Sequence, residues 1–278
     1  MRRAAVLGSP VAHSLSPVLH RAAYAALGLE GWRYDAIECD DVALPAFVGG
    51  LGLEWAGLSV TMPGKRAALE VAGSATATAA AVGAANTLVR SGAGGWLAEC
   101  TDVDGVIGSL RACGVTSAAS AVVLGAGGTA CATIVGLARL GVTSLTVVAR
   151  SALRATDALA CASRVGLAVE AVPWSALPSV TADVLVSTVP TGVVDPMAAL
   201  LARFPAVLDV VYHPWPTPLA SAVSSSGGRL ATGLDMLLHQ AFGQVELFTR
   251  RPAPREPMRD ALHAAVTAHG TDCPPLPL

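Results

Sequence analysis

The stretch of residues 121–154 constrains the fold of this chain more than any other. Two short apolar runs, at 121–124 and 145–149, enclose a glycine turn and an apolar segment that reaches Leu140. This order predicts a strand, a turn, a helix and a second strand, which together make one βαβ unit. Gly141 follows the predicted helix at the position where glycine commonly ends one. The chain is therefore expected to contain a parallel α/β domain.

The turn of this unit has the glycine spacing of a dinucleotide-binding fingerprint. Gly125 permits a tight turn, Gly127 lets a pyrophosphate approach the backbone, and Ala130 lets the helix and strand pack closely. The N-terminus of the following helix offers N–H groups and a positive dipole end to phosphates. The strand before the turn and the helix after it favour a nucleotide site over an ordinary glycine-rich loop. The candidate residues of this turn are Gly125, Ala126, Gly127, Gly128, Thr129 and Ala130.

The end of the second predicted strand indicates which dinucleotide is bound. An NAD-binding unit usually places Asp or Glu there to hold the ribose 2′-hydroxyl. This chain instead has Ala149, Arg150 and Ser151, then Arg154, and no carboxylate before Asp157. Guanidinium groups bind phosphate through paired hydrogen bonds. The segment therefore predicts a 2′-phosphate site and NADP, rather than two solvated arginines at the start of a helix.

Length and composition exclude several classes of protein. The 278 residues suffice for two domains, and a hydrophobic content of 53% supplies their cores. The formal net charge is only −2, so no nucleic-acid partner is expected. The uncharged segment 112–138 is interrupted by glycines and hydroxyl residues, which predicts a buried strand and helix and no membrane span. Pro10 and His13 interrupt any apolar signal-peptide core, so a cytoplasmic protein is expected.

The six cysteines do not have metal-binding spacing. None forms a CxxC pair, and no histidine cluster accompanies them at the spacing that metal ligands require. We therefore predict no metal site. Most of the cysteines lie in apolar surroundings, which favours buried free thiols in a reducing compartment.

Strand-like segments also alternate with helices before the dinucleotide unit, which predicts a first α/β domain. The expected strands of that domain are 4–7, 33–37, 57–60, 86–90 and 96–101, with helices at 17–27, 42–48, 65–71, 75–85 and 102–113. After the βαβ unit, strands are expected at 168–172, 184–188, 207–211 and 229–231, and helices at 234–249 and 256–269. The segment 213–218 is rich in proline and is expected to be a turn.

Polar side chains gather at the predicted carboxyl ends of the N-terminal strands, where open α/β sheets bind ligands. Hydroxyls, one amide, one lysine and one carboxylate suit a small polyhydroxylated acid. Lys65 and Asp102 would be its acid–base pair. Each residue alone has an ordinary explanation, since a lysine that opens a helix is usually solvated and Asp102 is a good N-cap. The candidates are Ser14, Ser16, Ser59, Thr61, Lys65, Asn86, Thr101 and Asp102.

Taken together, these segments closely resemble the shikimate dehydrogenase family. The matching motifs follow the family's order from the first predicted strand to the penultimate helix. They are GSPVAHSLSP at 8–17, SVTMPGK at 59–65, GAANT at 83–87, Thr101-Asp102, the glycine turn at 125–130, DVVY at 209–212 with Thr217-Pro218, and GLDMLLHQ at 233–240. A set of motifs this large, found in the family's order, is specific for the family.

The resemblance implies an α/β fold of two domains. Residues 1–103 and 235–278 would form an N-terminal α/β substrate domain closed by C-terminal helices, and residues 104–234 a Rossmann-type NADP-binding domain. The implied activity is the reversible NADPH-dependent reduction of 3-dehydroshikimate to shikimate, in aromatic amino acid biosynthesis. The implied partners are small molecules, and the protein would be a monomer or homodimer.

The resemblance also implies roles for individual residues. The substrate carboxylate would be held by Ser14 and Ser16 with Tyr212 near it, and the ring hydroxyls by Thr61, Asn86 and Gln240. Lys65 and Asp102 would handle the proton of the reacting hydroxyl as one coupled unit. Near the cofactor would lie Thr188, Val210 and Gly233.

Four segments depart from the family's common residues. Ser59 and Cys100 each replace an Asn, Ser187-Thr188-Val189 replaces Asn-Ala-Thr, and Ala149 replaces the Asn that precedes Arg150. Ser59 has a shorter hydrogen-bonding arm than Asn. The thiol of Cys100 is a weak hydrogen-bond donor and acceptor. We therefore expect the turn before Asp102 to be held less firmly and catalysis to be slower.

Two alternative functions are considered beside this one. Quinate dehydrogenases share the fold, and quinate differs from shikimate by an added hydroxyl at C1. Relatives that accept quinate tend to carry Thr at the second serine of the Ser-x-Ser motif, so Ser16 favours shikimate. The other alternative is a non-catalytic NADP-binding sensor in which Cys100 marks a decayed site. The intact pair of Lys65 and Asp102 argues against that sensor.

Overall fold

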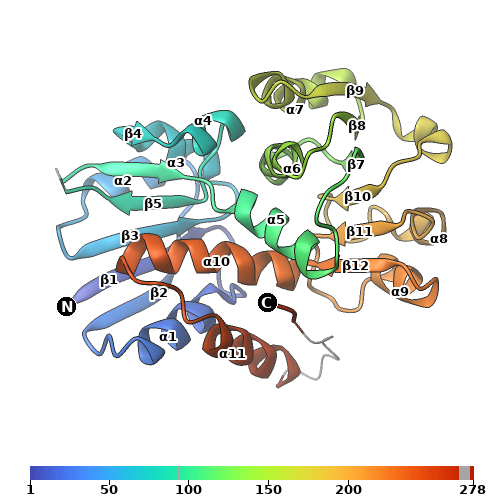
Figure 1. Cartoon of the computed structure of the whole chain (residues 1–278). Helices are drawn as coiled ribbons and strands as arrows, with labels where there is room; N and C mark the ends of the chain where they lie inside the picture. Colours follow the sequence, from blue (N-terminus) through green and yellow to red (C-terminus); the bar gives the residue numbers. More distant parts are fainter. Residues whose placement is uncertain (93, 269–275) are drawn as a thin grey trace. The chain divides into compact units, whose positions relative to one another are not determined.

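The computed structural model of the chain describes residues 1–92, 94–268 and 276–278 (Figure 1). The chain divides into two compact units. The N-terminal unit contains residues 1–101, 240–265 and 278, and the second unit contains residues 102–239 and 266–277. The second boundary falls inside helix α10 (Gly233–Thr249), so this helix contributes residues to both units.

A mixed six-stranded sheet forms the centre of the N-terminal unit, with the strand order β2-β1-β3-β5-β6-β4. Its strands are β1 (Arg2–Gly8), β2 (Trp32–Glu38), β3 (Trp55–Val60), β4 (Ser74–Ala75), β5 (Thr87–Arg90) and β6 (Trp96–Glu99). β1 runs parallel to β2 and β3, whereas β5 is antiparallel to β3 and β6. Every residue of β3 is buried, as expected of a central strand covered on both faces.

Helices cover this sheet. They are α1 (Ser16–Ala26), α2 (Leu44–Gly49), α3 (Lys65–Val71), α4 (Ala77–Val82), the later part of α10, and α11 (Arg255–Thr267). The end of α10 packs directly on β3, because a Cβ at Gly57 would overlap the ring of Phe248. The helix expected at 75–85 is shorter than predicted. Thr76 caps its N-terminus by accepting from the Ala79 N–H at 3.1 Å, and Gly83 ends it with a φ of 77°.

The second unit contains a fully parallel six-stranded sheet with the order β12-β11-β10-β7-β8-β9. Its strands are β7 (Ser120–Leu124), β8 (Ser144–Val148), β9 (Ala168–Val172), β10 (Val184–Ser187), β11 (Ala206–Asp209) and β12 (Arg229–Thr232). The chain winds outward from β7 first in one direction and then in the other. The order therefore reverses between β7 and β10, which is where doubly wound sheets bind nucleotides.

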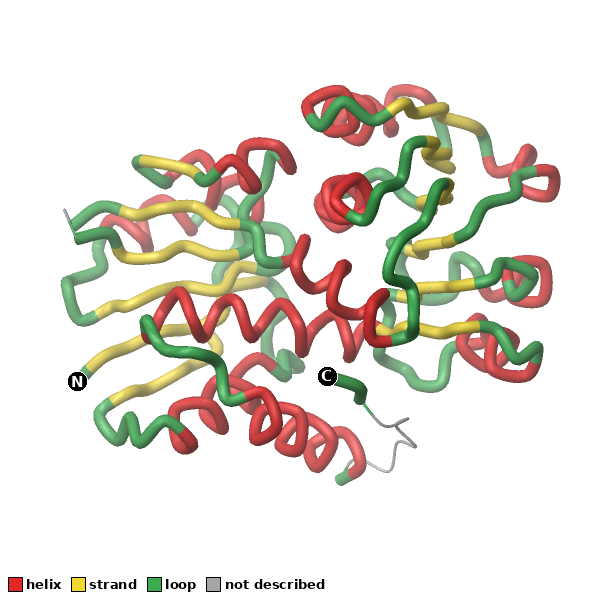
Figure 2. Tube along the Cα trace, viewed as in Figure 1, coloured by secondary structure: helices red, strands yellow, loops and turns green. Residues whose placement is uncertain are grey.

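Helices lie on both faces of this parallel sheet (Figure 2). They are α5 (Asp102–Ala112), α6 (Gly128–Arg139), α7 (Ala152–Arg164), α8 (Ala198–Leu201) and α9 (Pro218–Ser225), with 3₁₀ helices at Trp174–Ser179 and Asp195–Met197. Helix α9 begins inside the segment expected to be a proline-rich turn. Thr217 accepts from the Ala220 N–H at 3.0 Å and Pro218 occupies the first helical position, where proline is favoured.

The α/β fold class predicted from the sequence is confirmed by these two sheets. None of the helices in the described residues is long and apolar enough to cross a membrane. The described residues likewise contain no group of three or more His, Cys, Asp or Glu side chains that could hold a metal ion. Five cysteines are free thiols, whereas Cys273 and the predicted end of the last helix at His269 lie outside the described residues.

The close packing of α10 on β3 yields a test of the fold. Gly57→Ala should lower the free energy of unfolding by about 1–3 kcal/mol, because the added methyl overlaps the buried ring of Phe248. Gly49→Ala is the matched control. No atom lies within 4 Å of a Cβ at Gly49, so that change should be neutral or slightly stabilising. Urea unfolding followed by circular dichroism compares the two variants, and equal midpoints would show that Phe248 moves aside without cost.

Candidate active site

Two loops of the N-terminal unit meet at the carboxyl ends of β1 and β3. The Thr61 N–H donates to the Leu7 carbonyl at 2.8 Å, and a Cβ at Gly8 would overlap Thr61 Cγ2. Position 8 therefore requires glycine, because a side chain there would displace Thr61. Lys65 is half-buried at the first position of α3, and its carbonyl accepts from the Ala85 N–H at 2.9 Å. The loop after β3 is thus held against both β1 and the segment before β5.

The loop after β1 carries both serines of the Ser-x-Ser motif to the start of α1. Ser16 is the first residue of α1 and is buried, while Ser14 is half-buried. The Ser14 hydroxyl accepts from the Ser16 N–H at 3.3 Å. Helix N-termini carry a partial positive charge, so two hydroxyls at this position suit an anionic group such as a carboxylate.

The structure brings together three of the candidate residues, Asn86, Thr101 and Gln240. The Asn86 side chain is buried between the end of β3, the end of β6 and helix α10. Its Nδ2 donates to Thr101 Oγ1 at 3.0 Å and to Gln240 Oε1 at 3.3 Å. Its Oδ1 accepts from the Thr101 N–H at 2.8 Å. A single carboxamide therefore joins segments that lie up to 154 residues apart.

Beside this trio lies a buried group that the sequence did not predict, the Gln244 cluster, which consists of His20, Tyr34, Ser59, Thr87 and Gln244. The Gln244 Oε1 accepts from the Ser59 hydroxyl at 2.7 Å and lies 3.3 Å from His20 Nε2. The Tyr34 hydroxyl donates to Ser59 Oγ at 2.6 Å. The only sequence signal for the cluster is that Gln244 follows Gln240 by four residues, the spacing of neighbours on one helix face.

Ser59 was expected to contact the substrate, and the structure places its side chain in the interior of the N-terminal unit. It lies within β3 and is only 3% exposed. Its single O–H is donated to Gln244, and it accepts from Tyr34. A hydroxyl has one proton, and that of Ser59 is directed to Gln244. A contact of Ser59 with the substrate stays a prediction.

Burial keeps the Gln244 cluster uncharged near neutral pH. It lowers the pKa of His20 to about 3, although the hydrogen bond to Gln244 opposes this shift. The His20 ring stacks on Tyr34 with centroids 4.0 Å apart. Burial also raises the pKa of Tyr34, and its hydrogen bonds with Ser59 and Ser16 oppose this shift. Acid–base chemistry near pH 7 must therefore come from other residues.

Asn86 holds the turn before Asp102. Asn86 accepts from the Thr101 N–H and donates to the Thr101 hydroxyl. Cys100 is buried, and its N–H donates to the Glu99 carboxylate at 2.7 Å. The looser turn and slower catalysis expected from a thiol at position 100 stay a prediction. Asp102 itself is buried at the first position of α5, in the second unit.

The glycine turn of the second unit has the geometry that a dinucleotide needs. Gly125 has a φ of 100°, and a Cβ there would lie 2.7 Å from Thr188 Oγ1. Both facts require glycine. No atom lies within 4 Å of a Cβ at Gly127, which precedes α6 as its N-cap and offers no side-chain cap. Ala130 is fully buried against the sheet. The backbone at Gly127 is therefore open to a phosphate at a helix N-terminus.

The residues expected at a 2′-phosphate lie at the end of β8 and the start of α7. Ala149 is buried and its N–H donates to the Val172 carbonyl at 3.1 Å. Arg150, Ser151 and Arg154 are exposed. The Ser151 hydroxyl caps α7 by accepting from the Arg154 N–H at 3.4 Å. Two exposed guanidinium groups at a helix N-terminus can bind a phosphate.

Val210, Tyr212 and Gly233 also come together in the second unit. A Cβ at Gly233 would overlap the Val210 carbonyl and lie 3.2 Å from Tyr212 Cδ1. The loop that carries Val210 and Tyr212 is tied to the start of α9, because the Thr217 hydroxyl donates to Asp209 Oδ2 at 2.7 Å. Burial raises the pKa of the Asp209 carboxyl. The three residues expected near a nicotinamide or substrate carboxylate are thus neighbours.

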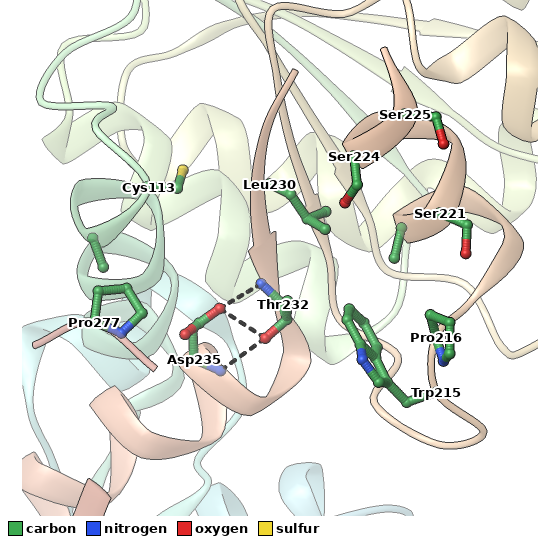
Figure 3. Close-up of a pocket in the computed structure, with 12 residues that line it drawn as sticks. Cys113, Trp215, Pro216, Ser221, Ser224, Ser225, Leu230, Thr232, Asp235 and Pro277 are labelled. Carbon is green, nitrogen blue, oxygen red and sulfur yellow. Dashed lines mark hydrogen bonds between the residues drawn. The ribbon is translucent and has the colours of Figure 1, made fainter. Parts of the chain in front are cut away.

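A cavity of about 540 Å³ lies beside β12 and α9 in the second unit (Figure 3). At its edge Thr232 and Asp235 form a reciprocal cap at the start of α10. The Asp235 carboxylate accepts from the Thr232 N–H at 2.8 Å, and the Asp235 N–H donates to the Thr232 hydroxyl at 3.2 Å. No residue predicted from the sequence as part of the site lines this cavity. It therefore lies outside the set of candidates.

Two segments of the chain, one toward each end, match models of known families. A family model described as the shikimate dehydrogenase substrate binding domain matches residues 6–88. A second model, described as the shikimate 5'-dehydrogenase C-terminal domain, matches residues 233–263. A curated protein from a Synechococcus strain, named shikimate dehydrogenase (NADP(+)), is 35% identical over 274 residues, which cover 92% of this chain and 93% of that protein.

Solved structures agree with this result. Shikimate dehydrogenase from Mycobacterium tuberculosis is 55% identical, with a TM-score of 0.90 over 95% of this chain and 100% of that one. Shikimate 5-dehydrogenase from Thermus thermophilus, solved in complex with NADP(H) and shikimate, is 34% identical, with a TM-score of 0.82 and coverage of 95% and 100%. With these matches over nearly its whole length, the chain belongs to the shikimate dehydrogenase family.

Proposed function

We propose that this protein catalyses the reversible NADPH-dependent reduction of 3-dehydroshikimate to shikimate. The observation that carries the proposal is the buried trio of Asn86, Thr101 and Gln240, which three separate family motifs supply and one side chain joins. The Synechococcus relative is named for NADP(+), and the Thermus relative binds NADP(H) and shikimate. In this function residues 1–103 and 235–278 form the substrate domain and residues 104–234 the NADP-binding domain.

Residues of the substrate domain, together with Tyr212 of the NADP-binding domain, would bind and orient the acid. Ser14 and Ser16, at the start of α1, hold its carboxylate with Tyr212 near it, and Thr61, Asn86 and Gln240 bind the ring hydroxyls. Hydroxyl and amide groups suit these oxygens because they can donate to a carboxylate and can donate to or accept from a hydroxyl.

Lys65 and Asp102 would handle the proton. They deliver it to the oxygen of the substrate carbonyl in the reducing direction and take it from the hydroxyl in reverse. They act as one coupled unit, so the proton belongs to the pair rather than to one fixed base. The neutral Gln244 cluster supports this assignment, because His20 is not protonated near pH 7.

NADP fits the second unit, where the open backbone at Gly127 and the exposed arginines suit its phosphates. When bound, the cofactor supplies the hydride. The residues that would hold it are Gly125, Ala126, Gly127, Gly128, Thr129, Ala130, Ala149, Arg150, Ser151, Arg154, Thr188, Val210 and Gly233. Arg150 and Arg154 would read its 2′-phosphate, which NAD lacks.

We further propose a cytoplasmic enzyme that acts on small molecules as a monomer or homodimer. The five described cysteines are free thiols, as expected in a reducing compartment. The net charge of −2 does not favour nucleic acid.

One steady-state experiment tests the function against its alternatives. Oxidation of shikimate and of quinate is measured with NADP and with NAD in parallel. Shikimate with NADP should give the highest kcat/KM. Faster turnover of quinate would make the protein a quinate dehydrogenase. Binding of NADP without turnover of either acid would support the alternative of a non-catalytic NADP-binding sensor.

Removing the Lys65 ammonium tests the proton pathway. Lys65→Met keeps the side-chain length and should lower kcat by about 10²–10⁴-fold, the usual effect of losing a general acid–base group. Arg66→Met, at the next and exposed position of α3, is the control and should leave kcat nearly unchanged. Shikimate oxidation at saturating NADP measures both variants. A Lys65→Met enzyme as fast as the control would refute the role of Lys65.

Removing both arginines tests cofactor choice. The double variant Arg150→Ala and Arg154→Ala should raise the KM for NADP roughly 10- to 100-fold for each guanidinium lost, since a charged hydrogen bond contributes about 1.5–3 kcal/mol. The KM for NAD should change little. Arg164→Ala, at the exposed end of the same helix, is the control. Equal weakening toward NADP and NAD would show that the arginines do not read the 2′-phosphate.

A further inference from the structure

We propose that Gln244 is a positioning residue that determines which atoms of Asn86 and Gln240 face the substrate. The proposal rests on the proposed function, which gives these two residues the ring hydroxyls. An Asn or Gln carboxamide has nearly the same shape when its oxygen and nitrogen exchange places. Something must therefore distinguish the two orientations. In this protein the orientation is set by a series of hydrogen bonds through Gln244, in which each group donates to the next.

The series begins at Tyr34. Its only O–H donates to Ser59 Oγ at 2.6 Å, so Ser59 uses its own O–H toward Gln244 Oε1 at 2.7 Å. The neutral His20 ring approaches the same oxygen through Nε2, at 3.3 Å. Because the Ser59 hydroxyl donates to Oε1, this end of the Gln244 carboxamide is its oxygen. The amide nitrogen must then face the opposite way.

The amide nitrogen of Gln244 in turn fixes the orientation of the Asn86 carboxamide. Gln244 Nε2 donates to Thr87 Oγ1 at 3.0 Å and to the Asn86 backbone carbonyl at 3.3 Å. Since Thr87 Oγ1 accepts from this amide, its single proton is directed to Asn86 Oδ1, at 2.8 Å. Asn86 Oδ1 also accepts from the Thr101 N–H at 2.8 Å. Two donors therefore fix the oxygen end of the Asn86 carboxamide.

The last step reaches Gln240. With its oxygen fixed, Asn86 directs Nδ2 toward Gln240 Oε1 at 3.3 Å, so the Gln240 amide nitrogen is turned away from Asn86. A hydroxyl can donate or accept, so the end of the Gln240 carboxamide that faces the ring hydroxyls decides whether they accept from it or donate to it. The titratable groups of the Gln244 cluster, His20 and Tyr34, have pKa values moved away from neutrality, which keeps the direction constant around pH 7.

The test is a double-mutant cycle between Gln244 and Thr87. Gln244→Met and Thr87→Val each remove one link while keeping most of the side-chain volume. Each should raise the KM for shikimate about 2- to 10-fold, the equivalent of one net hydrogen bond, and leave the KM for NADP unchanged. Because the two residues act in series, the double variant should be no worse than the poorer single variant. Thr87→Ser keeps the hydroxyl and should restore the wild-type KM.

Controls separate positioning from stability and from the proposed function itself. Thr249→Val makes the same chemical change on α10, where the hydroxyl donates to the Val245 carbonyl at 2.7 Å, and should not alter the KM for shikimate. If Gln244→Met does not fold, Tyr34→Phe breaks the series at its far end and should raise the same KM. A wild-type protein without shikimate turnover would refute the proposed function. If the wild type is active but the effects of the two single variants on the KM for shikimate multiply in the double variant, the role of Gln244 is refuted. The same holds if the variants raise the KM for NADP as much as the KM for shikimate. Neither outcome would refute the proposed function.

Discussion

The hydrogen bonding of the buried Asn86 carboxamide is the constraint on which the candidate substrate site depends. A buried amide group left without a partner costs about 1–3 kcal/mol, so its oxygen and nitrogen must both be satisfied. Asn86 meets this requirement through Thr101 at the end of β6 and Gln240 on α10. Satisfying one side chain thus brings three distant segments of the chain to one place. The same bonds hold the turn that leads to Asp102.

The second unit is organised by backbone geometry rather than by a buried polar side chain. Its parallel strands are covered by helices on both faces, and their order reverses beside β7. At this point the chain turns through Gly125 and Gly127, where a side chain would collide with Thr188 or block the approach of a phosphate. Charged side chains contribute only at the border of this candidate nucleotide site, where Arg150 and Arg154 are exposed at the start of α7.

The buried cluster of the N-terminal unit is separate from the residues proposed to move protons. The Gln244 cluster is buried and neutral, because burial lowers the pKa of His20 and raises that of Tyr34. Neutral groups can direct hydrogen bonds at any pH at which the enzyme works. The groups proposed to move protons, Lys65 and Asp102, lie outside this cluster at the first positions of two helices. Orientation and proton transfer are thereby assigned to different residues.

Local interactions explain what the sequence by itself determined. The glycine turn at 125–130, the helices that begin at Lys65 and Asp102, and the alternation of strands and helices depend on neighbouring residues, which a sequence pattern records. The sequence also determined the family, because its motifs are local. Only the tertiary structure decided that Ser59 bonds to Gln244, 185 residues away. No local pattern encodes that pairing, because it depends on how α10 packs on β3 and on which buried donors are left to satisfy.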